Sequence, residues 1–158
     1  MTVALELLRR LTFRACQVAL VTWLLFGVFL CHGVDALVIT EIHYHPRGAG
    51  DLAQRQEYIE IYNEAPGPID LSGYFFSEGI GFTFPPGTLL AGRQYLVIAA
   101  DVDLLRAQHG LHNVLGNWSS ATALDNGGER ITIANRSGAI VTTVDYNDRN
   151  RWPAGAEA

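Results

Sequence analysis

The sequence contains no lysine, and its 11 basic side chains, all arginines, face 16 aspartates and glutamates. With a net charge of −5, the chain lacks the basic surface that binding to nucleic acid phosphates requires. The absence of lysine also removes P-loop and Schiff-base chemistry. The sequence contains neither a Gly-x-Ser-x-Gly nucleophile motif nor a dinucleotide-binding fingerprint. We therefore predict a protein that is not an enzyme, carries no cofactor and binds no nucleic acid.

Cysteine is nearly absent as well, because Cys16 and Cys31 both lie within the first 36 residues. The other 158 − 36 = 122 residues contain no thiol. This excludes cysteine nucleophiles, thiolate zinc sites and disulfides from that part of the chain. A segment of this length can be held together by its hydrophobic core alone.

Residues 1–36 have the composition of an export signal. Three arginines precede an apolar run over residues 18–31, which is 14 residues long. A transmembrane helix needs roughly 20 apolar residues, so this run is short for a stable span. Val34 and Ala36 supply the small side chains that a signal peptidase requires before its cleavage site. We predict a hydrophobic signal helix, cleavage after Ala36 and an extracytoplasmic location. The alternative is an uncleaved membrane anchor.

From residue 37 onward, short β-branched and aromatic runs alternate with turns rich in glycine, proline and asparagine. The run at residues 94–100 (QYLVIAA) is continuous and, after Gln94, apolar, which predicts a strand buried on both faces. Residues 135–138 (NRSG) predict a hairpin turn between the last two strands. The predicted strands are residues 37–44, 58–62, 69–76, 82–84, 94–100, 131–134 and 139–146.

Only residues 102–108 predict a helix, with Asp101 as its N-cap, Leu104 and Leu105 turned inward, and Gly110 as its C-terminal stop. About seven short strands with one short helix predict an all-β fold. We therefore expect residues 37–158 to form an antiparallel β-sandwich.

Residues 38–46 (VITEIHYHP) and 57–63 (EYIEIYN) resemble the opening of bacterial lamin-tail domains. Further matches follow in the order of that family, at residues 69–74, 82–87, 90–92, 95–97, 126–129 and 131–133. Together they cover nearly all of the chain after the leader. The resemblance implies an immunoglobulin-like β-sandwich of the kind found as an appendage of larger exported proteins.

The chain departs from the family pattern at its first strand and near its end. Thr40 stands where the family usually has asparagine, and His43 and His45 replace more common residues. Family members continue past the Trp-Pro step into another strand, whereas Trp152-Pro153 is followed here by five residues. Either the domain lacks its closing strand, which leaves an open sheet edge, or the chain is a fragment of a longer protein.

His43 and His45 are the first candidates for a metal site. Two histidines two residues apart share one face of a strand, where Glu41 or Glu57 could complete a ligand set. Pro46, however, ends the strand immediately. We therefore predict a solvent-exposed strand exit at this position and no metal site.

Three other patterns are weaker candidates for a catalytic or metal site. Glu57 and Glu60 could form an acid–base pair, but residues three apart on a strand point to opposite faces, which favours exposed charges. His109 and His112 are separated by a glycine that ends the predicted helix. Residues 145–148 offer oxygen ligands for calcium but lack the glycine and terminal glutamate of a calcium loop.

The remaining candidates are tryptophans and turns. Trp118 and Trp152 are predicted to pack in the core or at a sheet edge, although an exposed tryptophan could contact a sugar or a partner. Residues 117–119 and 135–137 fit the glycosylation pattern, which matters only in a eukaryotic secretory pathway. We interpret the second as a hairpin turn and residues 125–129 as a turn in which glycines adopt positive φ.

These observations predict an exported, non-catalytic module for binding or surface association. We expect it to contact an unidentified protein or glycan at the cell surface, through the loops at residues 45–56 and 111–126 or at a sheet edge. Membrane contact is expected only through the leader, if it is not cleaved. One alternative is the targeting or accessory part of a larger secreted hydrolase or surface protein. The other is a small metalloprotein that uses His43 and His45.

Overall fold

The computed structural model describes residues 37–48, 50–118 and 121–149. The predictions on the leader, cleavage after Ala36, both cysteines, Trp152 and a missing closing strand lie outside these residues. Among the described residues, no helix has the length and apolar character needed to cross a membrane.

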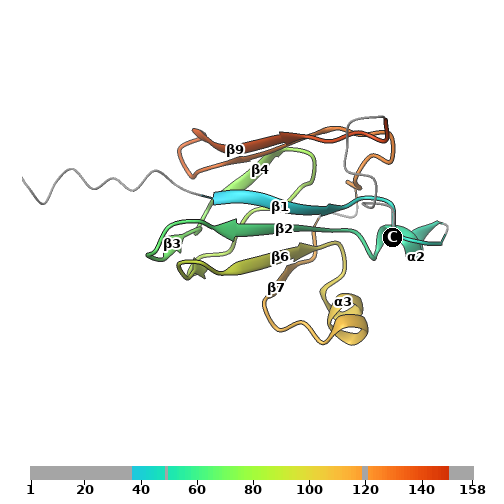
Figure 1. Cartoon of the computed structure of the whole chain (residues 1–158), viewed down its shortest axis with the longest axis horizontal. Coiled ribbons are helices and arrows are strands. Elements are labelled where there is room, and N and C mark those ends of the chain that lie inside the picture. The colour runs from blue at the N-terminus through green and yellow to red at the C-terminus, as the bar shows by residue number, and fades with distance from the viewer. Residues whose placement is uncertain (1–36, 49, 119–120, 150–158) are drawn as a thin grey trace, which may run out of the picture. The chain divides into compact units, whose positions relative to one another are not determined.

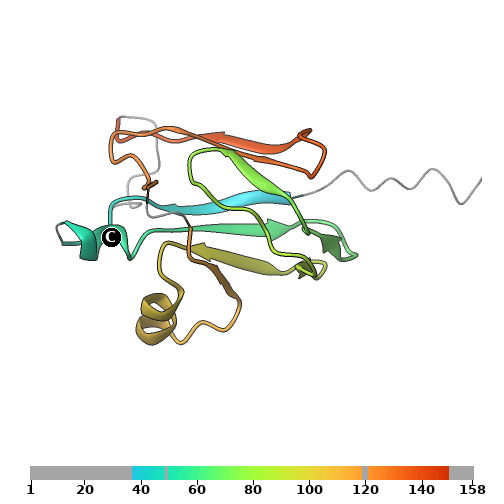
Figure 2. The same cartoon turned by 180° about the vertical axis from the view of Figure 1, so that it is seen from behind.

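The described residues form two larger sheets and one short strand pair (Figures 1 and 2). Figure 1 shows the strands of both larger sheets running in nearly the same direction, as in an aligned sandwich. The first sheet has the order β1 (Leu37–His43), β2 (Tyr58–Asn63), β6 (Tyr95–Ala99) and β7 (Val114–Gly116). The second has the order β4 (Phe75–Glu78), β8 (Arg130–Ala134) and β9 (Ile140–Asp145), and β3 (Ile69–Asp70) pairs with β5 (Leu89–Leu90).

The main core consists of alternate residues of the strands. Ile59 and Ile61 of β2 and Ile131 and Ile133 of β8 are fully buried in one hydrophobic cluster. Because successive side chains of a strand point to opposite faces, each strand contributes every second residue to this cluster. The prediction of an all-β, immunoglobulin-like β-sandwich with one short helix is confirmed.

Strand β6 is buried on both faces, as its apolar sequence predicts. Leu96 and Ile98 belong to the main cluster, whereas Val97 and Ala99 belong to a second, smaller cluster. The second cluster is completed by Leu105 of helix α3 (Val102–His109) and by one residue of β7. Burying both faces therefore requires α3 to cover the sheet.

Helix α3 begins and ends where the sequence predicts. The Asp101 carboxylate accepts a hydrogen bond from the Leu104 backbone N–H at 3.0 Å, and Gly110 ends the helix with φ 64°. Leu105 is buried, while Leu104 is only half-buried.

The parallel pairing of β7 with β6 was not predicted. It arises because the chain passes through α3 between these two strands and returns in the same direction.

The expected strand at residues 69–76 is divided into β3 and β4. The Asp70 carboxylate accepts the Ser72 N–H at 2.9 Å, and Gly73 adopts φ 73°, so the chain turns between the two strands. The expected strand at residues 82–84 is reduced to a single bridge between Thr83 and Phe75. The short strands β5 and β7 and one helical turn, α2 (Asp51–Gln54), were not predicted.

The last hairpin is confirmed. Strands β8 and β9 pair antiparallel, and the Asn135 N–H donates to the Ala139 carbonyl at 2.9 Å. The Asn135 side-chain oxygen also accepts the backbone N–H groups of Ser137 and Ala139, each at 3.0 Å. This asparagine therefore serves as a turn residue, as predicted.

Candidate ligand-binding site

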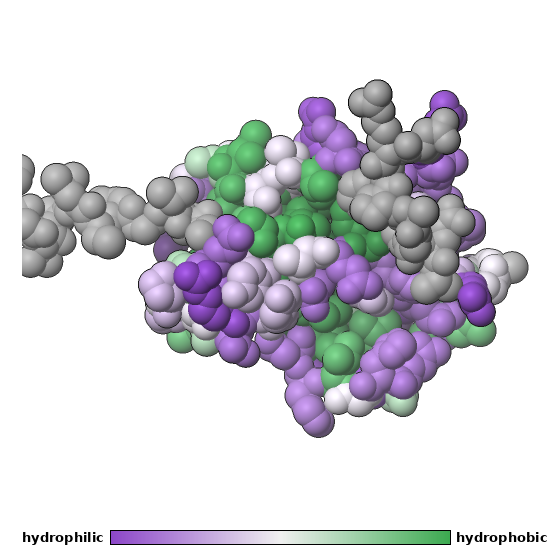
Figure 3. All heavy atoms as spheres, in the orientation of Figure 1, coloured by the Kyte–Doolittle hydropathy of each residue, from purple (hydrophilic) through white to green (hydrophobic). Residues whose placement is uncertain are grey.

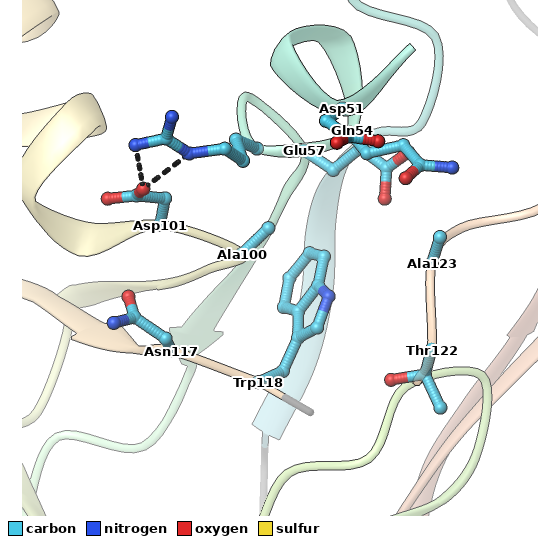
Figure 4. A pocket seen from close by; sticks show the side chains of 10 residues that line it. Asp51, Gln54, Glu57, Ala100, Asp101, Asn117, Trp118, Thr122 and Ala123 are labelled. Carbon is cyan, nitrogen blue, oxygen red and sulfur yellow. Dashed lines mark hydrogen bonds and ion pairs between the residues drawn. The ribbon is translucent and has the colours of Figure 1, made fainter. Parts of the chain in front are cut away.

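A polar cavity of about 390 Å³ lies at the end of the sandwich that carries α2 and α3 (Figures 1 and 4). Its walls come from the two loops that the sequence singled out, at residues 45–56 and 111–126, and from the residues that follow β6. The lining residues are Asp51, Gln54, Arg55, Glu57, Ala100, Asp101, Asn117, Trp118, Thr122 and Ala123.

Glu57 is the most buried ionisable group of this cavity, with an exposed fraction of 3%. One carboxylate oxygen, Oε2, accepts the Leu124 backbone N–H at 2.9 Å. The other, Oε1, has no hydrogen-bond partner among the described residues. Burial raises the pKa of Glu57 to about 7; the Leu124 N–H opposes this shift and the charge of Glu129 adds to it. Glu57 therefore exchanges its proton near neutral pH.

The interpretation of Glu57 as an exposed charge was wrong. Glu57 lies in register with Ile59 and Ile61, which face the core, so its side chain is directed inward with theirs. The expectation that Glu57 and Glu60 point to opposite faces is confirmed. The Glu60 carboxylate accepts the Thr40 hydroxyl at 2.8 Å on the outer face of the sheet.

Trp118 forms the wall opposite α2. Its exposed fraction is 6% and it belongs to the main core cluster, so the predicted packing role is confirmed. Figure 4 shows its indole below the Glu57 carboxyl, with Thr122 and Ala123 on a separate segment beside it. The indole N–H has no hydrogen-bond partner among the described residues. One tryptophan thus fills the core with part of its surface and lines the cavity with the rest.

Hydrogen bonds anchor the cavity walls to the sandwich. The Asn117 side-chain oxygen accepts the Val102 N–H at 2.7 Å, which joins the tryptophan segment to the start of α3. The Thr122 hydroxyl oxygen accepts the Gly81 N–H at 3.0 Å. The cavity is therefore formed before any ligand binds.

An ion pair closes one side of the cavity. Two nitrogens of Arg55, Nη2 and Nε, lie 2.6 and 2.8 Å from Oδ2 of Asp101. The Leu104 N–H, followed by Arg55, lowers the pKa of the Asp101 carboxyl. Asp101 therefore stays charged, caps α3 and holds the loop that contains α2.

The two histidines of the first strand lie apart from this cavity's lining. His43 stacks on Tyr58 with ring centroids 4.9 Å apart, and burial lowers its pKa. The Tyr58 hydroxyl donates to the Glu41 carboxylate, and His45 is exposed. The described ranges contain no group of three or more His, Cys, Asp or Glu placed to hold a metal ion.

The other candidate residues of the sequence analysis lie at a helix end, in an ion pair or in a turn. His109 ends α3, and both it and His112 are exposed. Within residues 145–148, Asp145 forms an ion pair with Arg130 at 2.8 Å, and the next residue is buried. The turn at residues 125–129 is confirmed, but positive φ is found only at its second glycine, Gly128, with φ 104°, and not at Gly127.

Two packed sheets with one short helix, as described above, are the architecture of an immunoglobulin-like β-sandwich domain. The family model of the Lamin Tail Domain matches residues 32–148, which is most of the chain, and the chain belongs to this family. No curated protein matches the sequence. Domains of this family are immunoglobulin-like binding domains and are generally not enzymes.

Proposed function

We propose that this protein is an exported, non-catalytic module that binds its partner in the cavity between the loops at residues 45–56 and 111–126. One observation carries the proposal: loops far apart in sequence meet at one end of the sandwich around a buried carboxyl and an indole. Binding residues are commonly presented in this way, on loops held by a rigid scaffold.

The outer face of the sheet is a weaker candidate. On the face drawn in Figure 3, hydrophilic residues separate two hydrophobic areas, so no single apolar patch extends across it. Thr40 and Glu60 are also hydrogen-bonded to each other on this face. A pre-formed cavity offers a partner both depth and polar groups, which is typical of a specific site.

The polar groups of the cavity favour binding over catalysis. Asp101 and Arg55 are paired with each other, and the Thr122 hydroxyl accepts a backbone N–H. Among the described residues that line the cavity there is no serine, cysteine or histidine, so the described lining does not show the nucleophile–base pair of a Ser–His type mechanism.

A variant that obstructs the cavity tests the proposal. Ala123 lines the cavity and is exposed, so Ala123→Phe should narrow it without disturbing the core. The matched control is Ala139→Phe, at an exposed position of the β8–β9 hairpin. We expect a surface-displayed peptide library and a glycan array to give partners whose binding falls at least tenfold in Ala123→Phe and not in the control. Binding that both variants retain would place the site elsewhere and overturn the proposal.

Export is tested separately. The predicted signal gives secreted material whose first residue is Leu37, measured by N-terminal sequencing. Full-length chain with Met1 intact in the membrane fraction would instead indicate the anchor.

A further inference from the structure

The chemistry of the cavity narrows the class of partner, a step that rests on the binding function proposed above. We propose that the cavity binds a cationic side chain of a protein partner, an arginine or a lysine, with Glu57 as the counter-charge and the Trp118 indole as the adjacent wall.

The first argument is the incomplete pairing of Glu57. A buried carboxylate is costly unless a cation or several hydrogen-bond donors compensate its charge. Glu57 receives one N–H, from Leu124, and Oε1 has no partner among the described residues. A guanidinium or ammonium that enters the cavity would supply Oε1 with a donor, and the ionised carboxylate with a counter-charge, that none of the described residues provides.

The second argument is that the cavity's own cation is already engaged. Among the described residues that line the cavity, Arg55 is the only basic one, and it binds Asp101 through two nitrogens. Asp51 adds a further carboxylate to the lining. Because Arg55 compensates Asp101, Glu57 and Asp51 are the carboxylates left without a cation among the described lining residues, which favours cations over phosphates, acidic peptides and acidic glycans.

The third argument is the position of Trp118. Glu57 and Trp118 both line the cavity, and Figure 4 draws the indole below the Glu57 carboxyl, so a cation that enters the cavity meets an acidic group and an aromatic ring in the same space. Cations are attracted to the faces of aromatic rings, and tryptophan gives the strongest effect. A neutral glycan could also stack on the indole, but it would leave the charge of Glu57 unpaired. The observations therefore favour a basic protein segment over a glycan.

The test compares small probes that differ in charge but not in shape. N-acetyl-arginine amide and N-acetyl-citrulline amide are nearly isosteric, and only the first is a cation. Calorimetric titration of the full chain should show at least tenfold tighter binding of the arginine probe, with N-acetyl-lysine amide also binding and N-acetylglucosamine not binding.

Two variants connect this difference to Glu57. Glu57→Gln retains an acceptor for the Leu124 N–H but removes the charge, so binding of the arginine probe should fall at least tenfold. Asp103→Asn removes an exposed charge of α3 outside the cavity and should leave binding unchanged. Chemical denaturation of each variant verifies that it is folded.

The outcomes separate this inference from the binding function itself. Equal affinity for the arginine and citrulline probes, or binding of N-acetylglucosamine alone, overturns the cationic partner and leaves the cavity as the binding site. If library partners bind Ala123→Phe and Ala139→Phe equally well, the binding function proposed for the cavity fails, and the inference fails with it.

Discussion

Two buried polar side chains at opposite ends of β2 differ sharply in their hydrogen bonding. Asn63, the last residue of β2, is fully buried, and Glu57 precedes the strand with an exposed fraction of 3%. The Asn63 side-chain oxygen accepts the Ala65 N–H at 2.9 Å. Its Nδ2 donates to the carbonyls of Gly67, Leu90 and Ala91 at 2.9, 3.1 and 3.1 Å. Glu57 accepts a single hydrogen bond, from Leu124.

The difference separates a structural end of the sandwich from the cavity end, the end at which we propose that a partner binds. A buried polar group with all its hydrogen bonds formed fixes the local backbone and has nothing to offer a ligand. A buried carboxylate beside a cavity, such as Glu57, can accept a further hydrogen bond from a ligand that enters the cavity. Figure 1 shows the two ends apart, with β3 at one and α2 and α3 at the other.

The largest effect is expected from removing the asparagine. Asn63→Ala leaves the buried Leu90 carbonyl, the Gly67 and Ala91 carbonyls of the partly buried bonds, and the Ala65 N–H without their partner, which should lower the free energy of unfolding by about 3 kcal/mol. Asn135→Ala is the matched control, because that side chain also accepts several hydrogen bonds but stands in an exposed turn, where a loss of about 1 kcal/mol is expected. Urea denaturation measures both. Equal losses would contradict a structural role specific to Asn63.

The backbone packing at the same end gives the second prediction. A Cβ at Gly92 would lie 2.2 Å from the Pro66 carbonyl oxygen, so Gly92→Ala must displace a loop next to Asn63. We expect a loss of about 2–3 kcal/mol in the free energy of unfolding. A Cβ at Gly67 would meet nothing within 4 Å, and Gly67→Ala should change stability by less than about 0.5 kcal/mol. A tolerated Gly92→Ala would show that this end is less rigid than its hydrogen bonds indicate.

At the cavity end, removal of the Glu57 charge should stabilise the protein. The pKa of Glu57 is raised from 4.5 to about 7, so between these values the folded protein keeps a proton that the unfolded chain has released. Stability therefore falls as pH rises from about 4.5 to 7 and stays low above it. Glu57→Gln lacks this loss and should be more stable than the wild type at pH 8, by about 1–2 kcal/mol.

Measuring the difference between the two proteins isolates Glu57 from other groups that titrate in the same range. His43, whose pKa is lowered by burial, contributes in the opposite direction, because the unfolded chain binds its proton first as pH falls. Glu129 is the charge that raises the pKa of Glu57 further. Denaturation of wild type and Glu57→Gln at pH 4.5, 6 and 8 should give a gap that widens with pH. A gap independent of pH would mean that Glu57 titrates normally.

Features that depend on neighbouring residues were predicted from the sequence, whereas features that depend on contacts between distant residues were not. Asp101 and Gly110 are local caps, so helix α3 was predicted from its own residues. The inward position of Glu57 was also readable, from its alternation with Ile59 and Ile61, but its charge favoured the opposite interpretation. The cavity could not be predicted from the sequence, because Glu57 and Trp118 are far apart along the chain and line the same cavity only in the tertiary fold. Strand β7 was missed for the same reason. Its three residues are too few to show a strand pattern, and they form a strand only by pairing with β6.

The smallest effect concerns Asp101, which links α3 to the cavity. Asp101→Ala removes both the helix cap and the ion pair with Arg55 and should lower the free energy of unfolding by about 1–2 kcal/mol. Asp101→Asn retains an equally good cap, and the Arg55 side chain is 56% exposed, so the loss should be below about 1 kcal/mol and should shrink in 1 M salt. If Asn costs as much as Ala, the ion pair rather than the cap holds this end together. The cavity end would then depend on charge for its stability as well as for the binding that we propose, unlike the neutral network around Asn63.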